Sequence, residues 1–180
     1  KNGLWFSTNL GLAYLSQDSY KTKNFRFFLS ENVNILRDNP IKEVVEDKFG
    51  NIWAIPDAIN IGLFRYSYED DTFQLFVNEK YNEFSISSNK FGDILIDNQD
   101  IIWLATDNHG IDMLDLHQKK FSLYRYDLGA HNTLSSDKIF GMDEDKEGNI
   151  WIASYNGLNK LNPHTNKIKH YNNQSMPGFF

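Results

Sequence analysis

The chain has 180 residues, of which 41% are hydrophobic and 23% charged, a balance typical of one folded domain or two small ones and not of a disordered protein. It has no cysteine, which excludes disulfides, thiolate nucleophiles and cysteine-bound metals. The net charge of −6 argues against nucleic acid as a partner, and the longest apolar runs, such as 101–105, are far shorter than the about 20 residues of a membrane-spanning helix.

Four similar segments follow one another along the chain, and each carries one tryptophan. The intervals between successive tryptophans are 48, 50 and 48 residues. Internal repeats of this length predict a row of equivalent structural units. The tryptophans are Trp5, Trp53, Trp103 and Trp151. The predicted units comprise residues 1–30, 31–80, 81–128 and 129–173, with a tail or linker at 174–180.

In chain order, the units differ in how complete they are. In the first unit only four residues precede Trp5, so the strand that opens the other units is missing. The second unit reads Asp-Lys-Phe-Gly-Asn-Ile-Trp-Ala over 47–54 and carries extra residues around 56–61. The third has Asp100 where the second and fourth have glycine. The fourth is the most regular copy.

The fourth unit contains four short runs with the composition and alternation of strands. The links between them are rich in Asp, Asn and Gly, which accept the backbone angles of tight turns. Links this short join antiparallel neighbours, so each full unit is predicted to be a four-stranded meander. In the fourth unit the predicted strands cover about 138–143, 150–153, 158–161 and 167–171.

Four strands in a repeat of roughly 40 to 50 residues are typical of a β-propeller blade. The predicted fold class is all-β, a β-propeller sector of about four blades, with the first blade lacking its strand a. A lone blade cannot bury both faces, so the tryptophans are predicted to fill the space between successive blades. The recurring glycines are predicted to be structural too: Gly11, Gly62, Gly110 and Gly157.

The incomplete first blade bears on whether the ring closes. A closed four-bladed ring would be expected to complete its first blade, so a sector of a larger ring is favoured. A sector exposes unpaired strand edges and apolar faces, which promote self-association. We therefore expect the isolated chain to pair with another copy.

The pattern over 145–161, Asp-x-x-Gly-Asn-Ile-Trp-Ile-Ala-Ser-x-x-Gly-Leu-x-x-Leu, resembles the two-component-regulator propeller repeat. The lead-in at 131–139, His-Asn-Thr-Leu-Ser-Ser-Asp-Lys-Ile, resembles it as well. The resemblance extends to about residue 171, with departures at Asp100 and around 56–61. Such repeats form the periplasmic sensor region of hybrid two-component system histidine kinases of the Bacteroidetes type.

This resemblance implies a sensor and not an enzyme. In this family the propellers precede a β-sandwich domain, a transmembrane helix, a histidine kinase, a receiver and a DNA-binding domain. The usual inputs are oligosaccharides, and the outputs are genes for polysaccharide utilisation. The resemblance therefore implies a membrane-anchored homodimer as the full protein, with this region in the periplasm. For this region, no cofactor and no nucleic acid contact are expected.

Two motifs resemble those of other functions, a calcium site and a sialidase. The segment 143–150 imitates the start of a calcium-binding EF-hand loop, but Ser154 stands where the loop should end in a bidentate Glu, so a hairpin turn is favoured. The sialidase Asp-box places its Asp one residue closer to Gly than Asp47 and Asp145 lie here. No metal ligand and no catalytic residue are predicted. With 24 acidic residues some pair will have glycosidase spacing by chance, so a glycan-active propeller stays as an alternative.

A binding face is predicted from the turns between the second and third strands, which vary among the units. In repeat proteins variable positions gather on the binding face. Planar amides and aromatic rings suit the hydroxyls and apolar ring faces of a sugar. The predicted ligand contacts are Asn108, His109, Tyr155 and Asn156, with ordinary solvated turn residues as the alternative interpretation.

The favoured function is a sensor propeller that recognises an oligosaccharide. A structural or protein-interaction propeller without a small ligand is the alternative from another class, and a glycan-active enzyme is the third.

Overall fold

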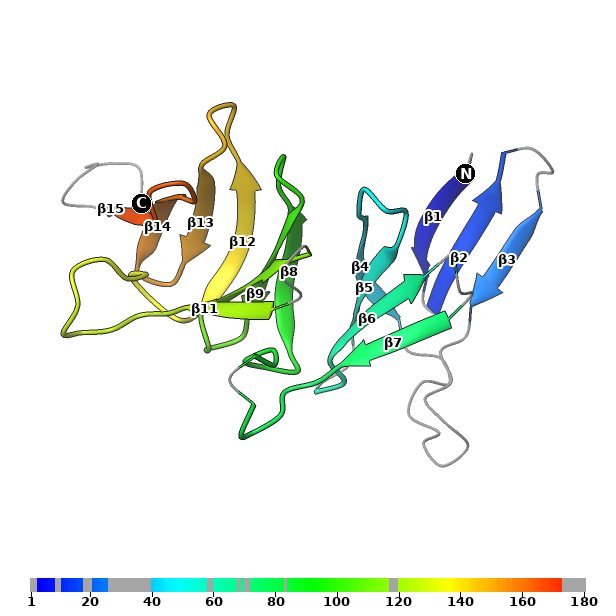
Figure 1. Cartoon of the computed structure of the whole chain (residues 1–180), viewed down its shortest axis with the longest axis horizontal. Helices are drawn as coiled ribbons and strands as arrows, with labels where there is room; N and C mark the ends of the chain where they lie inside the picture. The colour runs from blue at the N-terminus through cyan, green and yellow to red at the C-terminus, as the bar shows by residue number, and fades with distance from the viewer. Residues whose placement is uncertain are drawn as a thin grey trace. The chain divides into compact units, whose positions relative to one another are not determined.

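The computed structural model describes residues 3–8, 11–17, 21–25, 40–57, 60–67, 69, 72–82, 84–116 and 120–172. All regular structure in these residues is β-strand, arranged in four antiparallel sheets (Figure 1). The chain divides into two compact parts, residues 1–77 and 78–180. From here on these parts are called the first and second unit, and the four similar segments of the sequence are called repeats. The tail predicted at 174–180 lies outside the described residues, as do Asn9 and Ala58 in two of the predicted variable turns.

The first unit contains two sheets in which each strand pairs with the next one along the chain, in the orders β1-β2-β3 and β4-β5-β6-β7. Within the described residues no strand precedes β1 in its sheet, in agreement with the predicted loss of strand a. The strands are β1 (Gly3–Thr8), β2 (Gly11–Ser16), β3 (Thr22–Phe25), β4 (Ile41–Glu46), β5 (Ile52–Pro56), β6 (Leu63–Ser67) and β7 (Thr72–Phe76).

The second unit contains two four-stranded sheets of the same topology, β8 to β11 and β12 to β15. Its strands are β8 (Phe91–Ile96), β9 (Ile101–Thr106), β10 (Ile111–Asp115), β11 (Lys120–Tyr124), β12 (Ile139–Glu144), β13 (Ile150–Ser154), β14 (Gly157–Asn162) and β15 (Lys167–Tyr171). In the fourth repeat the observed bounds differ from the predicted ones by at most one residue at each end.

The burial of the strands follows their place in the sheet. β5 is buried along its whole length, and β9 over all but its first residue, so both read as continuous apolar runs. The outer strand β7 is exposed over most of its length and is more polar. The second strands β5 and β9 are thus covered on both faces, whereas the outer strand β7 is largely open to solvent.

The apolar faces within each unit pack against one another. In the first unit Trp5 of β1 packs on a core that includes Ile41, Ile52 and Tyr66, and its ring centroid lies 5.6 Å from that of Tyr66. The contacts between β1 and β4 bring the two sheets of this unit together. Trp5 therefore lies where the prediction puts a residue that fills the space between blades.

The core of the second unit joins its two sheets in the same way. Trp103 and Ala105 of β9 share one cluster with Ile150 and Ile152 of β13. Trp103 has 0% of its surface exposed. β12, the first strand of the last sheet, also contacts β8 and β9, next to which Figure 1 shows it.

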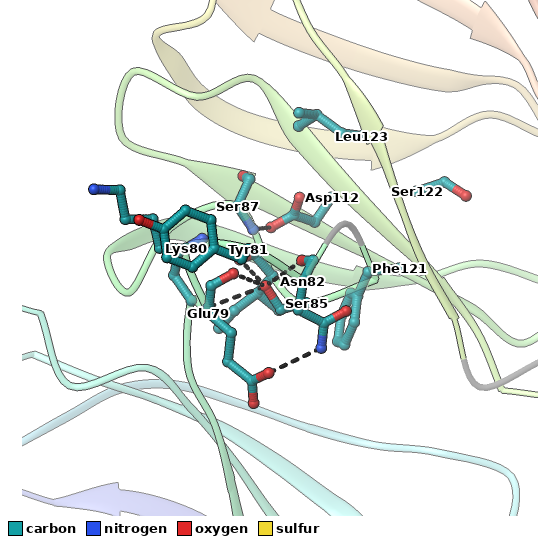
Figure 2. A pocket seen from close by; sticks show the side chains of 12 residues that line it. Glu79, Lys80, Tyr81, Asn82, Ser85, Ser87, Asp112, Phe121, Ser122 and Leu123 are labelled. Atoms are coloured by element: carbon teal, nitrogen blue, oxygen red, sulfur yellow. Dashed lines mark hydrogen bonds between the residues drawn. The ribbon is translucent and has the colours of Figure 1, made fainter.

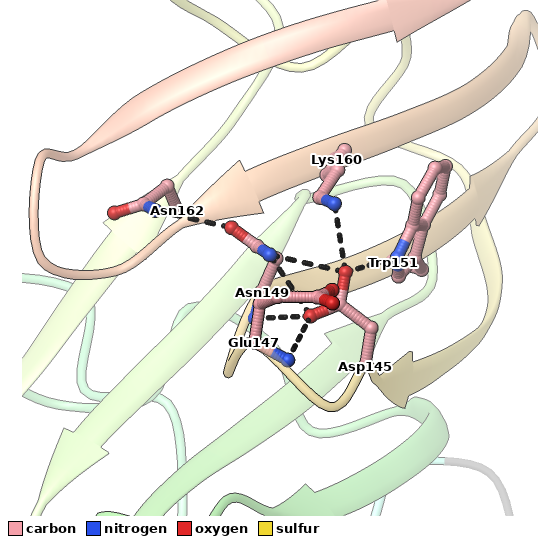
Figure 3. Close-up of polar contacts among 6 residues, drawn as sticks. All are labelled: Asp145, Glu147, Asn149, Trp151, Lys160 and Asn162. Carbon is pink, nitrogen blue, oxygen red and sulfur yellow. Dashed lines mark hydrogen bonds and ion pairs between the residues drawn. The ribbon is translucent and has the colours of Figure 1, made fainter.

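A hydrogen-bonded aspartate turn precedes the tryptophan of each four-stranded sheet. In the turn between β12 and β13, Asp145 Oδ1 accepts hydrogen bonds from the backbone N–H groups of Glu147 (3.0 Å) and Asn149 (2.9 Å) (Figure 3). Asp145 Oδ2 accepts one from Trp151 Nε1 at 2.9 Å. Equivalent indole bonds join Trp53 to Asp47 at 2.9 Å and Trp103 to Asp97 at 2.8 Å. This double role explains why Asp and Trp recur six residues apart.

The third turn keeps this geometry although Asp100 replaces its glycine. Asp100 has a φ of 64°, close to the 78° of Gly50 and the 76° of Gly148. Aspartate tolerates the left-handed region better than most residues, so the turn survives the substitution. The departure at Asp100 therefore leaves the aspartate turn intact.

The recurrence of glycine after the second strand of a repeat has a steric cause. Gly110 has a φ of 81°, and a Cβ at this position would lie 2.0 Å from the carbonyl oxygen of Tyr124. The same close approach recurs at Gly62 with Phe76 and at Gly157 with Tyr171. Only glycine combines this backbone angle with so close a neighbouring strand.

Candidate ligand-binding face

The predicted contact residues lie in two exposed turns of the second unit. Asn108 and His109 are in the turn between β9 and β10, and Tyr155 and Asn156 form the turn between β13 and β14. Tyr155 has 69% of its surface exposed.

The first of these turns is held by neighbouring segments of the chain. The backbone N–H of Asp107 donates to the carbonyl oxygen of Lys90, and that of Gly110 donates to the carbonyl oxygen of Asp137 (3.0 Å). The Lys90 ammonium also pairs with the Asp107 carboxylate and lowers its pKa. Asn108 Nδ2 donates to Asp107 Oδ1 at 2.9 Å. The turn is therefore fixed from two sides while the faces of its side chains stay open to solvent.

The second turn is held by the segment that leads into β12. The backbone N–H of Tyr155 donates to the carbonyl oxygen of Lys138 (3.0 Å), and Asn156 Nδ2 donates to that of Ser135 (3.0 Å). Lys138 Nζ lies 5.8 Å from the ring centroid of Tyr155 and 5.7 Å from that of Phe140. Both turns thus rest on the same stretch, 135–138, which brings the predicted residues to one side of the unit.

Sequence reasoning missed two residues of this side, Lys138 and Phe140. Phe140 lies on β12 next to the buried Ile139 and has 58% of its surface exposed. The repeats contained a signal for Phe140, because the second repeat has Lys42 at the equivalent position and the third has Gly92. An aromatic residue at an exposed strand position, beside a lysine, distinguishes the fourth repeat from the other two. We call the six residues the candidate face: Asn108, His109, Lys138, Phe140, Tyr155 and Asn156.

The candidate face has the chemistry of a site for a polar ligand with apolar patches. Two exposed aromatic rings flank one ammonium group, and amide and imidazole groups supply donors and acceptors. Cations are attracted to aromatic faces, so Lys138 is held between the two rings.

In the aspartate turn between β12 and β13, the carboxylate of Asp145 is already paired with donor groups of the protein. Lys160 Nζ lies 2.8 Å from Asp145 Oδ2, in addition to the turn and indole bonds (Figure 3). Burial would raise the pKa of Asp145, but the hydrogen bonds from Lys160, Asn149 and Trp151 outweigh it and hold the pKa well below its ordinary value. The geometry is that of a hairpin turn. Among the described residues no group of three His, Asp or Glu side chains is arranged to hold a metal ion.

Residues 133–156 match the family model described as two component regulator propeller. The chain contains a two-component-regulator propeller repeat. This repeat includes four residues of the candidate face, Lys138, Phe140, Tyr155 and Asn156. The predicted resemblance to these repeats is thereby confirmed.

Solved structures share the fold. The chain is similar to the extracellular domain of BT3049 from B. thetaiotaomicron, which is assigned to a hybrid two component system, with 25% identity and a TM-score of 0.72 over 94% of this chain and 23% of that one. It is also similar to virginiamycin B lyase from Staphylococcus aureus, with 12% identity and a TM-score of 0.63 over 94% and 52% of the two chains. An auxiliary nutrient binding protein from Bacteroides thetaiotaomicron has 7% identity and a TM-score of 0.60, over 94% and 38%.

These comparisons confirm the predicted fold class, an all-β propeller sector. The lyase and the nutrient binding protein show the fold alone, because their identity is low. The chain spans about a quarter of the length of the BT3049 domain.

No curated protein sequence matches the chain significantly. Within the described residues, the structure has no helix of the length and hydropathy needed to cross a membrane.

Proposed function

We propose that this chain is part of the extracytoplasmic sensor region of a hybrid two-component system protein and that its candidate face recognises an oligosaccharide. The observation that carries the proposal is the matched repeat, because it holds most of the candidate face. The similarity to the extracellular domain of BT3049 supports the location. A histidine kinase output, a membrane anchor and a homodimer belong to the proposed intact protein, of which this chain is one section.

The arrangement of the candidate face favours a sugar among polar ligands. Sugar rings have apolar faces that stack on aromatic side chains, and Tyr155 and Phe140 present such surfaces. Hydroxyl groups both donate and accept hydrogen bonds, as do the side-chain amides of Asn108 and Asn156. A ligand that spans the two turns would bridge the sheets β8–β11 and β12–β15, and this gives binding a way to change their relative position.

The proposal predicts that Tyr155→Ala and His109→Ala each weaken oligosaccharide binding at least ten-fold. The measurement is a thermal-shift screen of neutral oligosaccharides, followed by calorimetric titration of any sugar that stabilises the chain. Lys146→Ala is the matched control, because Lys146 is an exposed residue of the β12–β13 turn outside the candidate face. Equal losses in control and test variants, or unchanged binding in both test variants, would contradict the assignment of the face.

The same incubations separate the other functions. A shared fold with virginiamycin B lyase leaves the activity of this chain to be decided by experiment. We expect chromatography of the sugars to show no cleavage products. Cleavage would favour the glycan-active alternative. A complete absence of stabilisation across the screen would favour the protein-interaction alternative.

A further inference from the structure

A concave site lies in the second unit and is lined by residues that do not belong to the candidate face. It is a pocket of about 340 Å³, formed by the segment that leads into β8 together with β10 and β11 (Figure 2). This volume is within the range of small-molecule sites. The residues that line it include Glu79, Lys80, Tyr81, Ser87, Asp112 and Phe121, and none of them belongs to the candidate face.

Asp112 is the unusual residue of this pocket. It has 1% of its surface exposed, and its Oδ2 accepts a hydrogen bond from the backbone N–H of Ser87 at 2.9 Å. Among the described residues it forms no ion pair. The hydroxyl oxygen of Ser87 is also buried and has no hydrogen-bond partner there. Buried polar groups are normally satisfied, so a buried carboxylate with one hydrogen bond and no ion pair, beside a buried hydroxyl without a partner, calls for an explanation.

The fourth repeat provides an internal comparison. Asn159 occupies the position equivalent to Asp112, because each is the second residue after the recurring glycine. Asn159 Oδ1 accepts from the backbone N–H of Ser135 (2.8 Å), as Asp112 does from Ser87. Its Nδ2 donates to Ser154 Oγ (3.1 Å) and to the carbonyl oxygen of Ile152 (3.3 Å). In the fourth repeat an amide thus satisfies this position fully.

The charge of the pocket points to the missing partner. The pocket is lined by two carboxylates, those of Asp112 and Glu79, and by one ammonium, that of Lys80, which lies 5.4 Å from the ring centroid of Tyr81. A ligand ammonium would supply both the opposite charge and several N–H donors. The rings of Tyr81 and Phe121 offer contacts for the carbon chain of such a ligand. We propose that this pocket binds a small primary-amine compound whose ammonium group pairs with Asp112.

The test is calorimetric titration of the 180-residue chain with 1,4-diaminobutane at pH 7.5. We expect saturable binding of the diamine, no binding of the uncharged analogue 1,4-butanediol, and at least ten-fold weaker diamine binding in Asp112→Asn. Asp143→Asn is the matched control, because it removes an exposed carboxylate and changes the net charge equally. Its affinity for the diamine should equal that of the original chain.

A second readout locates the site. In a ¹⁵N-labelled sample the diamine should shift the amide resonance of Ser87, which bonds Asp112. Circular dichroism of Asp112→Asn checks that the variant is folded. Failure of the diamine to bind, equal binding by Asp112→Asn, or shifts that spare Ser87 would each overturn the proposal. The oligosaccharide screen uses other ligands and variants of other residues, so either proposal can fail without the other.

Discussion

Replacing Trp103 by alanine is expected to destabilise the second unit by about 3–5 kcal/mol, the usual cost of removing a fully buried tryptophan. The ring is 0% exposed and lies in the cluster that joins β9 to β13. Its loss would leave a cavity between the sheets and would remove the indole donor from the buried Asp97 carboxylate. Urea unfolding followed by circular dichroism measures the change.

Two variants separate packing from hydrogen bonding. Trp103→Phe keeps an aromatic ring but removes the bond to Asp97, and we expect it to cost about 1–3 kcal/mol. Trp151→Ala makes the same truncation on the last sheet, where the tryptophan is only partly buried, and should cost clearly less than Trp103→Ala. Equal losses at Trp103 and Trp151 would show that the tryptophans do not act by filling the space between sheets.

Replacing Asp112 by asparagine is expected to stabilise the chain at pH 7.5. Burial raises the pKa of Asp112 to about 6 from its ordinary 3.8, against the opposing hydrogen bond from Ser87. Because the folded state holds its proton more tightly than the unfolded state, stability is highest below pH 3.8 and falls as the pH rises through 6. The full difference is about 3 kcal/mol, or roughly 5–10 °C in Tm.

Thermal unfolding of both proteins at pH 4 and pH 7.5 checks this prediction. Asp112→Asn should gain at pH 7.5 and change little at pH 4. Glu79 and Lys80 line the same pocket and the charge of His109 acts on Asp112, but all three are present in both proteins and cancel in the comparison. Asn159→Asp in the fourth repeat should show the opposite sign. A loss of stability in Asp112→Asn at pH 7.5 would mean that the carboxylate serves the fold.

The spacing of the tryptophans was enough to predict the architecture, because Trp53, Trp103 and Trp151 are each tied to a local turn. Asp145 and Trp151 are six residues apart and bonded to each other, so the signal survives in the sequence without any long-range information. The strand bounds of the fourth repeat followed from the turn residues that separate them. The repeats also showed that glycine recurs at the position of Gly110. The cause of this recurrence, the nearby carbonyl oxygen of Tyr124, lies on another strand.

The two candidate sites were harder to predict because they depend on contacts between segments distant in sequence. Lys138 joins the candidate face through the ring of Tyr155, and the Gly110 turn joins it through a bond to Asp137. Neither contact has a fixed spacing in the sequence. Asp112 looked like an ordinary polar residue after a glycine, and only its burial distinguishes it. A comparison with Asn159 in the aligned repeats could have marked the position, but not the pocket beside it.

The central claim, that this chain is a sector of a larger sensor propeller, is tested most directly by sequencing the coding region on both sides of it. We predict further tryptophan-spaced repeats, then about 20 consecutive apolar residues and a histidine kinase domain. A stop codon close after Phe180, with only a signal peptide upstream of Lys1, would contradict the claim and would leave a small independent propeller in its place.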